Sequence, residues 1–188
     1  MNGDTNDCSR CEPSVVLNWK NAQHVLEHMG AHVLFDNLLD TSEELCGMCI
    51  HPTLMCQFYL RKPRGASANY SVDYKKSSCV NLMHFNYATA STSSGASPCS
   101  NVPVSCPLCP DGSPAVWKYS LKTHFRGKHR LKSCAHFPIK VSLPQSERNG
   151  MKKVWHSHHK LPKLHTLKSK KQIALSVSEA HHARLYLP

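Results

Sequence analysis

The clearest hydrophobic pattern in this chain lies at residues 21–36, where apolar side chains recur at the three- and four-residue spacing of a helix. Its apolar positions are Val25, Leu26, Met29, Val33 and Leu34. Asn21 precedes them, and its side chain can accept a hydrogen bond from a free backbone N–H of the first turn. The pattern therefore predicts a helix with one apolar face that begins at Asn21.

Shorter apolar runs predict strands. Residues 54–60 and 115–119 are the best candidates, and a further short strand is expected near residues 85–87. Residues 61–67 contain Pro and Gly and are predicted to form a loop, while the Ser-, Thr- and Ala-rich residues 88–98 are predicted to be a flexible connection. The chain is therefore expected to be α+β and built from short elements.

The last part of the chain has a different pattern. Beyond Arg130 large apolar residues are few and Lys and His are frequent, so residues 140–176 are predicted to be mostly disordered. A short helix can follow from Ser178 to Leu187, but a helix of this length is marginal in water without packing partners. No apolar run approaches the ~20 residues that span a bilayer, so no contact with a membrane is expected.

Ten cysteines and 14 histidines are the unusual feature of the composition. The first residues lack the basic start and apolar stretch of a secretory signal, so the cysteines are expected to stay reduced and to bind metal. Their positions suggest four domains: a finger-like segment (1–40), a Cys-rich β segment (41–100), a Cys2His2 finger (101–131) and a basic tail (132–188).

Charge is distributed unevenly along the chain, whose formal net charge is +11. Residues 1–60 hold two basic and eight acidic residues, a net of −6, whereas residues 61–188 hold the other 21 basic and four acidic residues, a net of +17. The carboxyl part is therefore expected to contact a polyanion such as nucleic acid, and the acidic amino half can bind a protein partner.

The strongest candidate site follows the sequence Cys106-Pro-Leu-Cys109. After 14 further residues come His124 and His129, separated by four residues. Zinc takes four thiolate or imidazole ligands in a tetrahedron, and a C-x2-C turn followed by two histidines on one helix face supplies them. The apolar residues expected beside the metal are Leu121 and either Phe125 or Trp117. This spacing predicts a ββα-type zinc finger.

A second C-x2-C turn lies near the amino terminus, at Cys8 and Cys11. Three histidines follow at helical spacing, His24, His28 and His32, and two of them can complete a zinc site. The pair His24 and His28 has the commonest finger spacing. We favour His28 and His32, because an apolar residue lies three positions before His28, as in the other finger.

The middle segment has five cysteines, one more than a zinc site needs. Cys79 and Cys99 are each followed by the pattern x-Asn-apolar, which suggests two equivalent turns. With Cys46 and Cys49 they are predicted to form an all-cysteine zinc site. Cys56 lies in a predicted strand, where a buried inert thiol is expected, but it is the obvious substitute ligand. Weaker substitutes are His51 and His84.

Several segments together resemble a known group of proteins: Gln23–Asp36, Cys46–Cys49, Ser97–Cys109 and Val116–Tyr119, with further similarity at Gly150–Trp155 and Val177–Ala180. They resemble uncharacterised CCHH-type zinc-finger proteins that are abundant in mushroom-forming fungi. The resemblance implies zinc binding and a nuclear, DNA-associated role, and it supplies no catalytic residue. His24 and Cys134 depart from the usual pattern of this family, which weakens His24 as a ligand.

These features predict small zinc-stabilised α+β modules, namely ββα-type fingers and a β-rich all-cysteine segment, followed by a disordered basic tail. Three zinc ions (Zn2+) are expected. The predicted function is that of a nuclear zinc-binding protein that binds nucleic acid, DNA in the first place. The alternative is a zinc-built module that binds another protein without recognising DNA directly.

Base recognition by these fingers is expected to be weak. In a ββα finger three helix positions before the ligand histidines face the bases. Those positions are Trp117, Ser120 and Thr123 in one finger and Asn21, His24 and Glu27 in the other. The first set lacks the Arg, Asn, Gln or Lys side chains that pair with base edges, and the second lies in the acidic half.

Two basic clusters, Lys152-Lys153 and residues 168–171, resemble a bipartite nuclear import signal. No catalytic motif accompanies them. The His-x-Glu of a zinc deaminase, the H-E-x-x-H of a metalloprotease, the P-loop and the G-x-S-x-G elbow do not occur in the sequence. The protein is therefore predicted not to be an enzyme.

Overall fold

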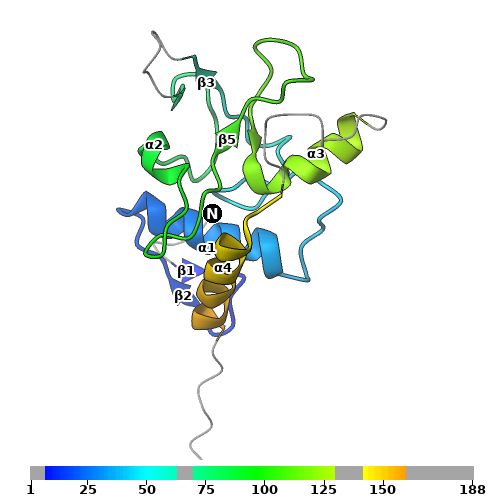
Figure 1. The fold of residues 1–188 in the computed structure, drawn as a ribbon. Coiled ribbons are helices and arrows are strands. Elements are labelled where there is room, and N and C mark those ends of the chain that lie inside the picture. Colours follow the sequence, from blue (N-terminus) through cyan, green and yellow to red (C-terminus); the bar gives the residue numbers. More distant parts are fainter. Residues whose placement is uncertain (1–6, 63–69, 130–141, 160–188) are drawn as a thin grey trace, which may run out of the picture.

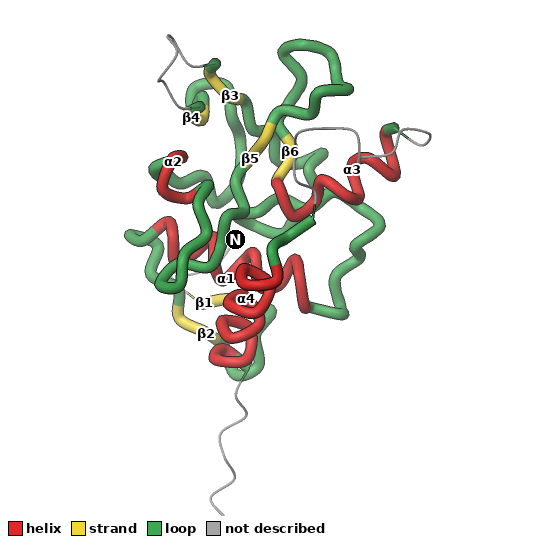
Figure 2. Tube along the Cα trace, in the orientation of Figure 1, coloured by secondary structure: helices red, strands yellow, loops and turns green. Residues whose placement is uncertain are grey.

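The protein was examined as a computed structural model, which describes residues 7–62, 70–129 and 142–159. Figures 1 and 2 show short strands and helices joined by long loops. The strands are β1 (Asp7–Cys8) paired with β2 (Val15–Val16), β3 (Leu60–Arg61) with β4 (Ser71–Val72), and β5 (Pro103–Val104) with β6 (Val116–Trp117). All three pairs are antiparallel. The fold is therefore a small α+β arrangement, as expected.

The helices follow the local signals of the sequence. They are α1 (Ala22–Phe35), α2 (Tyr87–Ala90), the 3-10 helix η1 (Lys118–Ser120), α3 (Leu121–Lys128) and α4 (Gln145–His158). Asn21 caps α1, because its side-chain oxygen accepts a hydrogen bond of 3.2 Å from the backbone N–H of His24. The predicted start of this helix is confirmed.

A hairpin followed by a helix occurs twice. The β1–β2 hairpin leads into α1, and the β5–β6 hairpin leads through η1 into α3. In each hairpin the C-x2-C turn lies near the end of the first strand, and its backbone closes on itself. The N–H of Cys11 bonds the carbonyl of Cys8 at 3.3 Å, and the N–H of Cys109 bonds the carbonyl of Cys106 at 3.3 Å. Both finger-like segments thus have a ββα topology.

Segments far apart in the sequence share one apolar core, which we call the main core. Its fully buried members include Leu26, Met48, Phe58, Val102, Trp117 and Met151. The rings of Phe58 and Trp117 meet edge to face, with centroids 4.9 Å apart. Each of the four segments that the sequence suggested as separate domains contributes to this core.

Part of the chain that was predicted to be disordered is the helix α4, which packs along α1 (Figure 1). Met151 is completely buried, and Glu147 is only 1% exposed. The Glu147 carboxylate accepts hydrogen bonds from the backbone N–H of Ser100 at 3.0 Å and from the hydroxyl of Tyr119 at 2.7 Å. Burial, together with the nearby thiol and carboxylate, raises the pKa of Tyr119, so this hydroxyl keeps its proton.

Two other sequence predictions are corrected. The strand expected near residues 85–87 does not form, because the Asn86 side chain caps the short helix α2 by accepting from the N–H of Thr89 at 3.0 Å. Most of the strand expected at residues 54–60 is a loop that makes single bridges at Gln57 and Phe58. The short helix predicted from Ser178 lies outside the described residues.

Gly47 offers a test of how tightly the middle segment packs. A Cβ atom added there would lie 2.3 Å from Cε3 of the buried Trp117 and 2.7 Å from the side-chain nitrogen of Asn101. Neither neighbour can move away cheaply, so we expect Gly47→Ala to reduce the free energy of unfolding by about 2–3 kcal/mol. Urea denaturation of protein prepared with added zinc measures this change. Gly95→Ala is the control, since nothing lies within 4 Å of the added atom; equal stability of the two variants would contradict the packing.

Candidate metal centres

In the part of the chain that the structure describes, three groups of Cys and His side chains each bring four potential ligand atoms within 4.8 Å of one another, and each group could hold a metal ion. Centre 1 is the group Cys8, Cys11, His28 and His32. Centre 2 is the group Cys46, Cys49, Cys56 and Cys79. Centre 3 is the group Cys106, Cys109, His124 and His129. Every cysteine in the described part of the chain is a free thiol.

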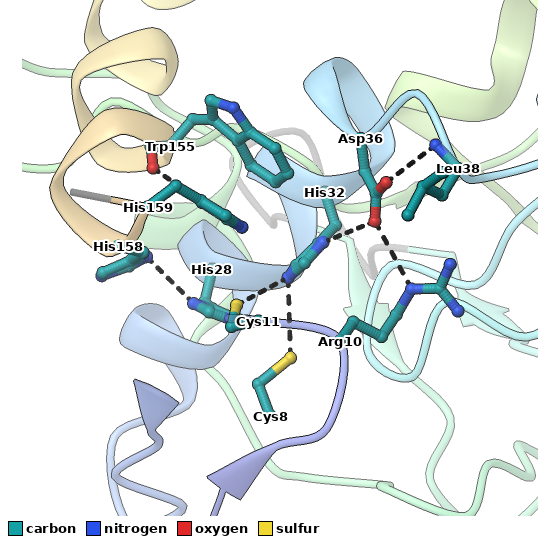
Figure 3. Close-up of polar contacts among 10 residues, drawn as sticks. All are labelled: Cys8, Arg10, Cys11, His28, His32, Asp36, Leu38, Trp155, His158 and His159. Carbon is teal, nitrogen blue, oxygen red and sulfur yellow. Dashed lines mark hydrogen bonds and ion pairs between the residues drawn. The ribbon is translucent and has the colours of Figure 1, made fainter. Parts of the chain in front are cut away.

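Centre 1 lies between the β1–β2 hairpin and the buried face of α1 (Figure 3). Nε2 of His32 lies 3.2 Å from the sulfur of Cys11 and 3.5 Å from that of Cys8. Nε2 of His28, one turn earlier on α1, lies 3.6 Å from the sulfur of Cys11. The alternative ligand His24 is outside the group, and its ring lies 6.1 Å from that of His158.

Each histidine of centre 1 uses its other ring nitrogen to contact a second residue. Nδ1 of His32 lies 2.9 Å from Oδ2 of Asp36, and Nδ1 of His28 lies 3.0 Å from Nδ1 of His158 on α4 (Figure 3). Burial opposes ionisation of Asp36, but its hydrogen bonds with His32, the backbone N–H of Leu38 and Arg10, together with the charge of His32, outweigh this and lower the pKa of the carboxyl. Such contacts fix the tautomer and the ring orientation of a metal ligand.

The two thiols of centre 1 differ in acidity. Burial opposes ionisation of Cys8, but hydrogen bonds with His28 and His32 outweigh it and lower its pKa to about 5. Burial and the neighbouring Cys8 raise the pKa of Cys11 to about 12. One thiolate therefore forms readily and the second is resisted by like charge, which is the repulsion that a bound dication removes.

Centre 2 is made only of thiols. The sulfurs of Cys49 and Cys56 lie 3.3 Å apart, and those of Cys46 and Cys79 lie 3.8 Å apart. The backbone N–H of Met48 donates to the Cys46 sulfur at 3.5 Å. Hydrogen bonds from Cys46 and Cys49 lower the pKa of Cys79 to about 5, whereas hydrogen bonding to Cys49 and Cys79 raises that of Cys46. As in centre 1, one thiolate is favoured at the expense of its neighbours.

Cys56, and not Cys99, is the fourth member of centre 2, so the sequence-based placement of Cys99 is corrected. Gln57 and Ser78 pair in an antiparallel bridge, with N–H···O distances of 3.0 and 2.8 Å in the two directions. The residues directly beyond this bridge are Cys56 and Cys79, which are therefore brought opposite each other. The register of Gln57 against Ser78 therefore decides that Cys56, and not Cys99, lies close to Cys79.

Cys99 lies beneath α1, away from centre 2. Its thiol donates to the carbonyl of Leu26 at 3.4 Å, and burial raises its pKa to about 12, so it stays protonated. The turn inferred from the repeated pattern does exist: the N–H of Asn101 donates to the Cys99 sulfur at 3.5 Å, as that of Asn81 donates to the Cys79 sulfur at 3.4 Å. The two turns are equivalent locally but face different parts of the molecule.

Centre 3 joins the β5–β6 hairpin to α3. Nε2 of His129 lies 3.4 Å from both cysteine sulfurs, and Nε2 of His124 lies 3.4 Å from the sulfur of Cys109. Burial, and in second place the hydrogen bond with Cys106, raise the pKa of the Cys109 thiol to about 11. The pKa of the Cys106 thiol is lowered, because its hydrogen bonds together outweigh the effect of burial. The apolar residues packed beside the group are Val116, Leu121 and Phe125. The other candidate, Trp117, belongs to the main core.

The spacing of these atoms suits a small tetrahedral ion. A tetrahedron with bonds of about 2.3 Å to sulfur and about 2.0–2.1 Å to nitrogen has edges of about 3.3–3.8 Å. The close contacts run from 3.2 Å, between Cys11 and His32, to 3.8 Å, between Cys46 and Cys79. Thiolate and imidazole ligands favour zinc over the oxygen-seeking Ca2+ and Mg2+. The residues present therefore fit zinc.

Three residues beside the ligands were not found from the sequence. They are Asp36 at His32, His158 at His28, and Glu44, whose Oε1 lies 2.9 Å from Nδ1 of His124. Asp36 has a usable signal, since it follows His32 by four residues at the end of the same helix. Glu44 and His158 are separated from their partners by long stretches of chain and have no such signal.

Comparison with known proteins gives no match for this chain among protein-family models, curated proteins or solved structures. The family resemblance described above therefore stays a prediction. Among the helices of the described ranges, none has both the length and the apolar character needed to cross a bilayer.

Proposed function

We propose that this protein binds three zinc ions, which hold its segments together as one scaffold, and that the scaffold binds another macromolecule through surfaces other than the base-reading faces of its finger helices. The observation that supports this proposal is the position of the residues that would face DNA bases in a ββα finger. In both finger-like segments these residues make contacts within the protein itself.

The helix of the centre 3 finger is covered by the acidic segment before centre 2. Trp117 is 1% exposed and belongs to the main core. The hydroxyl of Ser120 accepts from the N–H of Leu45 at 3.2 Å and donates to its carbonyl at 3.0 Å. The hydroxyl of Thr123 donates to the carbonyl of Thr41 at 3.1 Å. For this face to enter a major groove, residues 41–45 would have to detach.

The helix of the centre 1 finger is covered in the same way. Asn21 uses its side chain to cap the helix, and the ring of His24 faces that of His158 on α4. The carboxylate of Glu27 accepts from the hydroxyl of Ser97 at 2.6 Å. Base recognition by this helix would require α4 and the loop before Cys99 to move away. A scaffold role needs no such rearrangement.

A second candidate function is nucleic-acid binding through phosphate contacts, which we place in the nucleus. Exposed basic side chains on α3 and α4 favour it: Lys122, Arg126, Lys128, Arg148, Lys152 and Lys153. Such contacts depend on charge and carry no base information. This candidate leaves the covered helix faces in place, so it is compatible with the scaffold.

Selection of duplexes from a random DNA pool tests the first proposal. We expect no consensus sequence, because the base-reading positions of both finger helices in the described part of the chain make contacts within the protein. Recovery of a consensus that disappears in Thr123→Ala would contradict the proposal. The full zinc-loaded chain is needed, since its segments share one core.

The second candidate predicts a steep dependence of DNA affinity on salt. If the exposed basic residues neutralise about six phosphates, affinity should fall by about 10³ or more between 50 and 200 mM salt. Fluorescence anisotropy with a labelled duplex measures this change. Lys122→Glu with Lys152→Glu should flatten the slope, and Lys20→Glu, at an exposed position in the acidic half, is the matched control. A flat response in the unmodified protein would remove this candidate.

A further inference from the structure

Glu44 joins two metal centres that are far apart in the sequence. Its Oε1 lies 2.9 Å from Nδ1 of His124 in centre 3, and the two side chains are 17% and 6% exposed. Nε2 of the same histidine faces the sulfur of Cys109 at 3.4 Å. When Nε2 binds a metal, Nδ1 must carry the proton, and the Glu44 carboxylate is placed to accept a hydrogen bond from this N–H.

The position of Glu44 depends on the C-x2-C turn of centre 2, which begins two residues later at Cys46. The carbonyl of Glu44 accepts from the N–H of Thr53 at 2.8 Å, across the turn. At the base of the turn the N–H of Cys46 donates to the carbonyl of His51 at 2.8 Å. Leu45, which lies between Glu44 and Cys46, pairs with Pro52 in an antiparallel bridge. Glu44 is therefore held at the base of the turn that presents two thiols to centre 2.

This turn contains a strained backbone position. Ile50, which follows Cys49, has a φ of 62°, a left-handed conformation that is unfavourable for a β-branched residue. The turn also brings the sulfurs of Cys46 and Cys49 within 4.8 Å of each other. A metal ion bound by both sulfurs at centre 2 would hold the turn in this shape, and with it Glu44.

We propose that Glu44 is a positioning residue for zinc at centre 3, and that zinc at centre 2 holds Glu44 in place, so that the two centres load cooperatively. The inference rests on the proposed zinc binding. Binding at one centre then raises affinity at the other by the same factor, as thermodynamic linkage requires. Centre 1 provides the contrast, because the carboxylate at its His32 comes from Asp36, the residue that directly follows the same helix. Centre 1 is therefore expected to be independent of Glu44.

Protection of the thiols from alkylation measures each centre separately in the full chain. The zinc-loaded protein is titrated with a chelator and treated with N-ethylmaleimide, and peptide mass spectrometry reports which cysteines have reacted. Glu44→Ala should move the chelator midpoint of Cys106 and Cys109 to concentrations about 10–100-fold lower. The midpoint of Cys8 and Cys11 should not move. Glu44→Gln keeps an acceptor without the charge and should restore part of the loss.

Glu43→Ala is the matched control, because Glu43 is exposed and adjacent to Glu44; it should leave all three midpoints unchanged. Cys49→Ser should weaken centre 3 in the same direction as Glu44→Ala. The double variant should lose less than the sum of the two single variants, since both act on one contact.

Three results would overturn the inference: an unchanged centre 3 midpoint in Glu44→Ala, an unchanged centre 3 midpoint in Cys49→Ser, or an equal loss at all three centres in Glu44→Ala. The last would indicate general destabilisation, and Glu44→Ala detects it because it leaves all four thiols of centre 2 in place. Failure of zinc binding itself is seen separately, as no protection of Cys106 and Cys109 in the unmodified protein.

Discussion

Removal of all bound zinc with excess EDTA should unfold the described part of the protein. The strands are only two residues long, so their pairing alone is marginal. Structural zinc contributes on the order of 10 kcal/mol or more per site, which is comparable to the ~5–15 kcal/mol that stabilises an entire domain. The free energy lost with the metals should therefore exceed the net folding free energy that apolar packing can supply.

The expectation that no cluster survives removal of zinc comes from the position of the ligands. Each apolar cluster contains some of them: Cys46 and Cys56 lie in the main core, Cys8 and Cys11 in the cluster around centre 1, and Cys106 in the cluster beside centre 3. Removal of the metal from a centre therefore frees the cysteines that hold its apolar cluster together.

Far-UV circular dichroism and tryptophan fluorescence, followed during the same EDTA titration, measure this transition. We expect both signals to change, because Trp117 and Trp155 pack in or against the main core and Trp19 packs by centre 1. EDTA saturated with zinc beforehand is the control. A fold and a melting temperature that survive EDTA would disprove the structural role of the metal.

Replacement of Cys56 by Ser should remove one zinc ion, whereas replacement of Cys99 should remove none. Cys56 lies 3.3 Å from Cys49 in centre 2, and a serine hydroxyl is a poor substitute for a thiolate on zinc. Cys99 is a protonated thiol that bonds the carbonyl of Leu26, and a hydroxyl can make the same bond. The two variants make the same chemical change at two buried cysteines.

Native mass spectrometry of protein made with added zinc counts the metals in each variant. We expect three zinc ions in the unmodified protein and in Cys99→Ser, and two in Cys56→Ser. Loss of centre 2 should also lower the melting temperature of Cys56→Ser by many degrees. The reverse result, with zinc lost only in Cys99→Ser, would restore the ligand set expected from the spacing alone.

The covered helix faces change how the zinc-finger motifs should be interpreted. A ββα segment with the right spacing ordinarily suggests a DNA-binding unit, yet Ser120 and Thr123 here bond to residues 41–45. The same two motifs therefore serve to join segments of one fold. The acidic amino half takes part in this, since Asp36 and Glu44 hold ligand histidines of centres 1 and 3.

Local chemistry in the sequence was enough to predict the start of α1, the α+β class and the two hairpin–helix segments. Each of these features depends on residues that lie close together in the sequence. The helix cap bonds to an N–H three residues later, the two thiols of each finger lie in one turn, and its two imidazoles come from one helix or its end. The same kind of reasoning identified equivalent turns after Cys79 and Cys99, and both turns form.

Contacts across long stretches of chain could not be predicted in this way. The choice of Cys56 over Cys99 follows from the register of Gln57 against Ser78, and the pairing of Glu44 with His124 follows from packing of two segments 80 residues apart. Helix α4 has a weak apolar pattern and is held by the buried Glu147, whose partners lie in another segment. Spacing and periodicity describe which groups a short stretch can present, because they follow from backbone geometry, whereas the partner that each group meets depends on how the segments pack together.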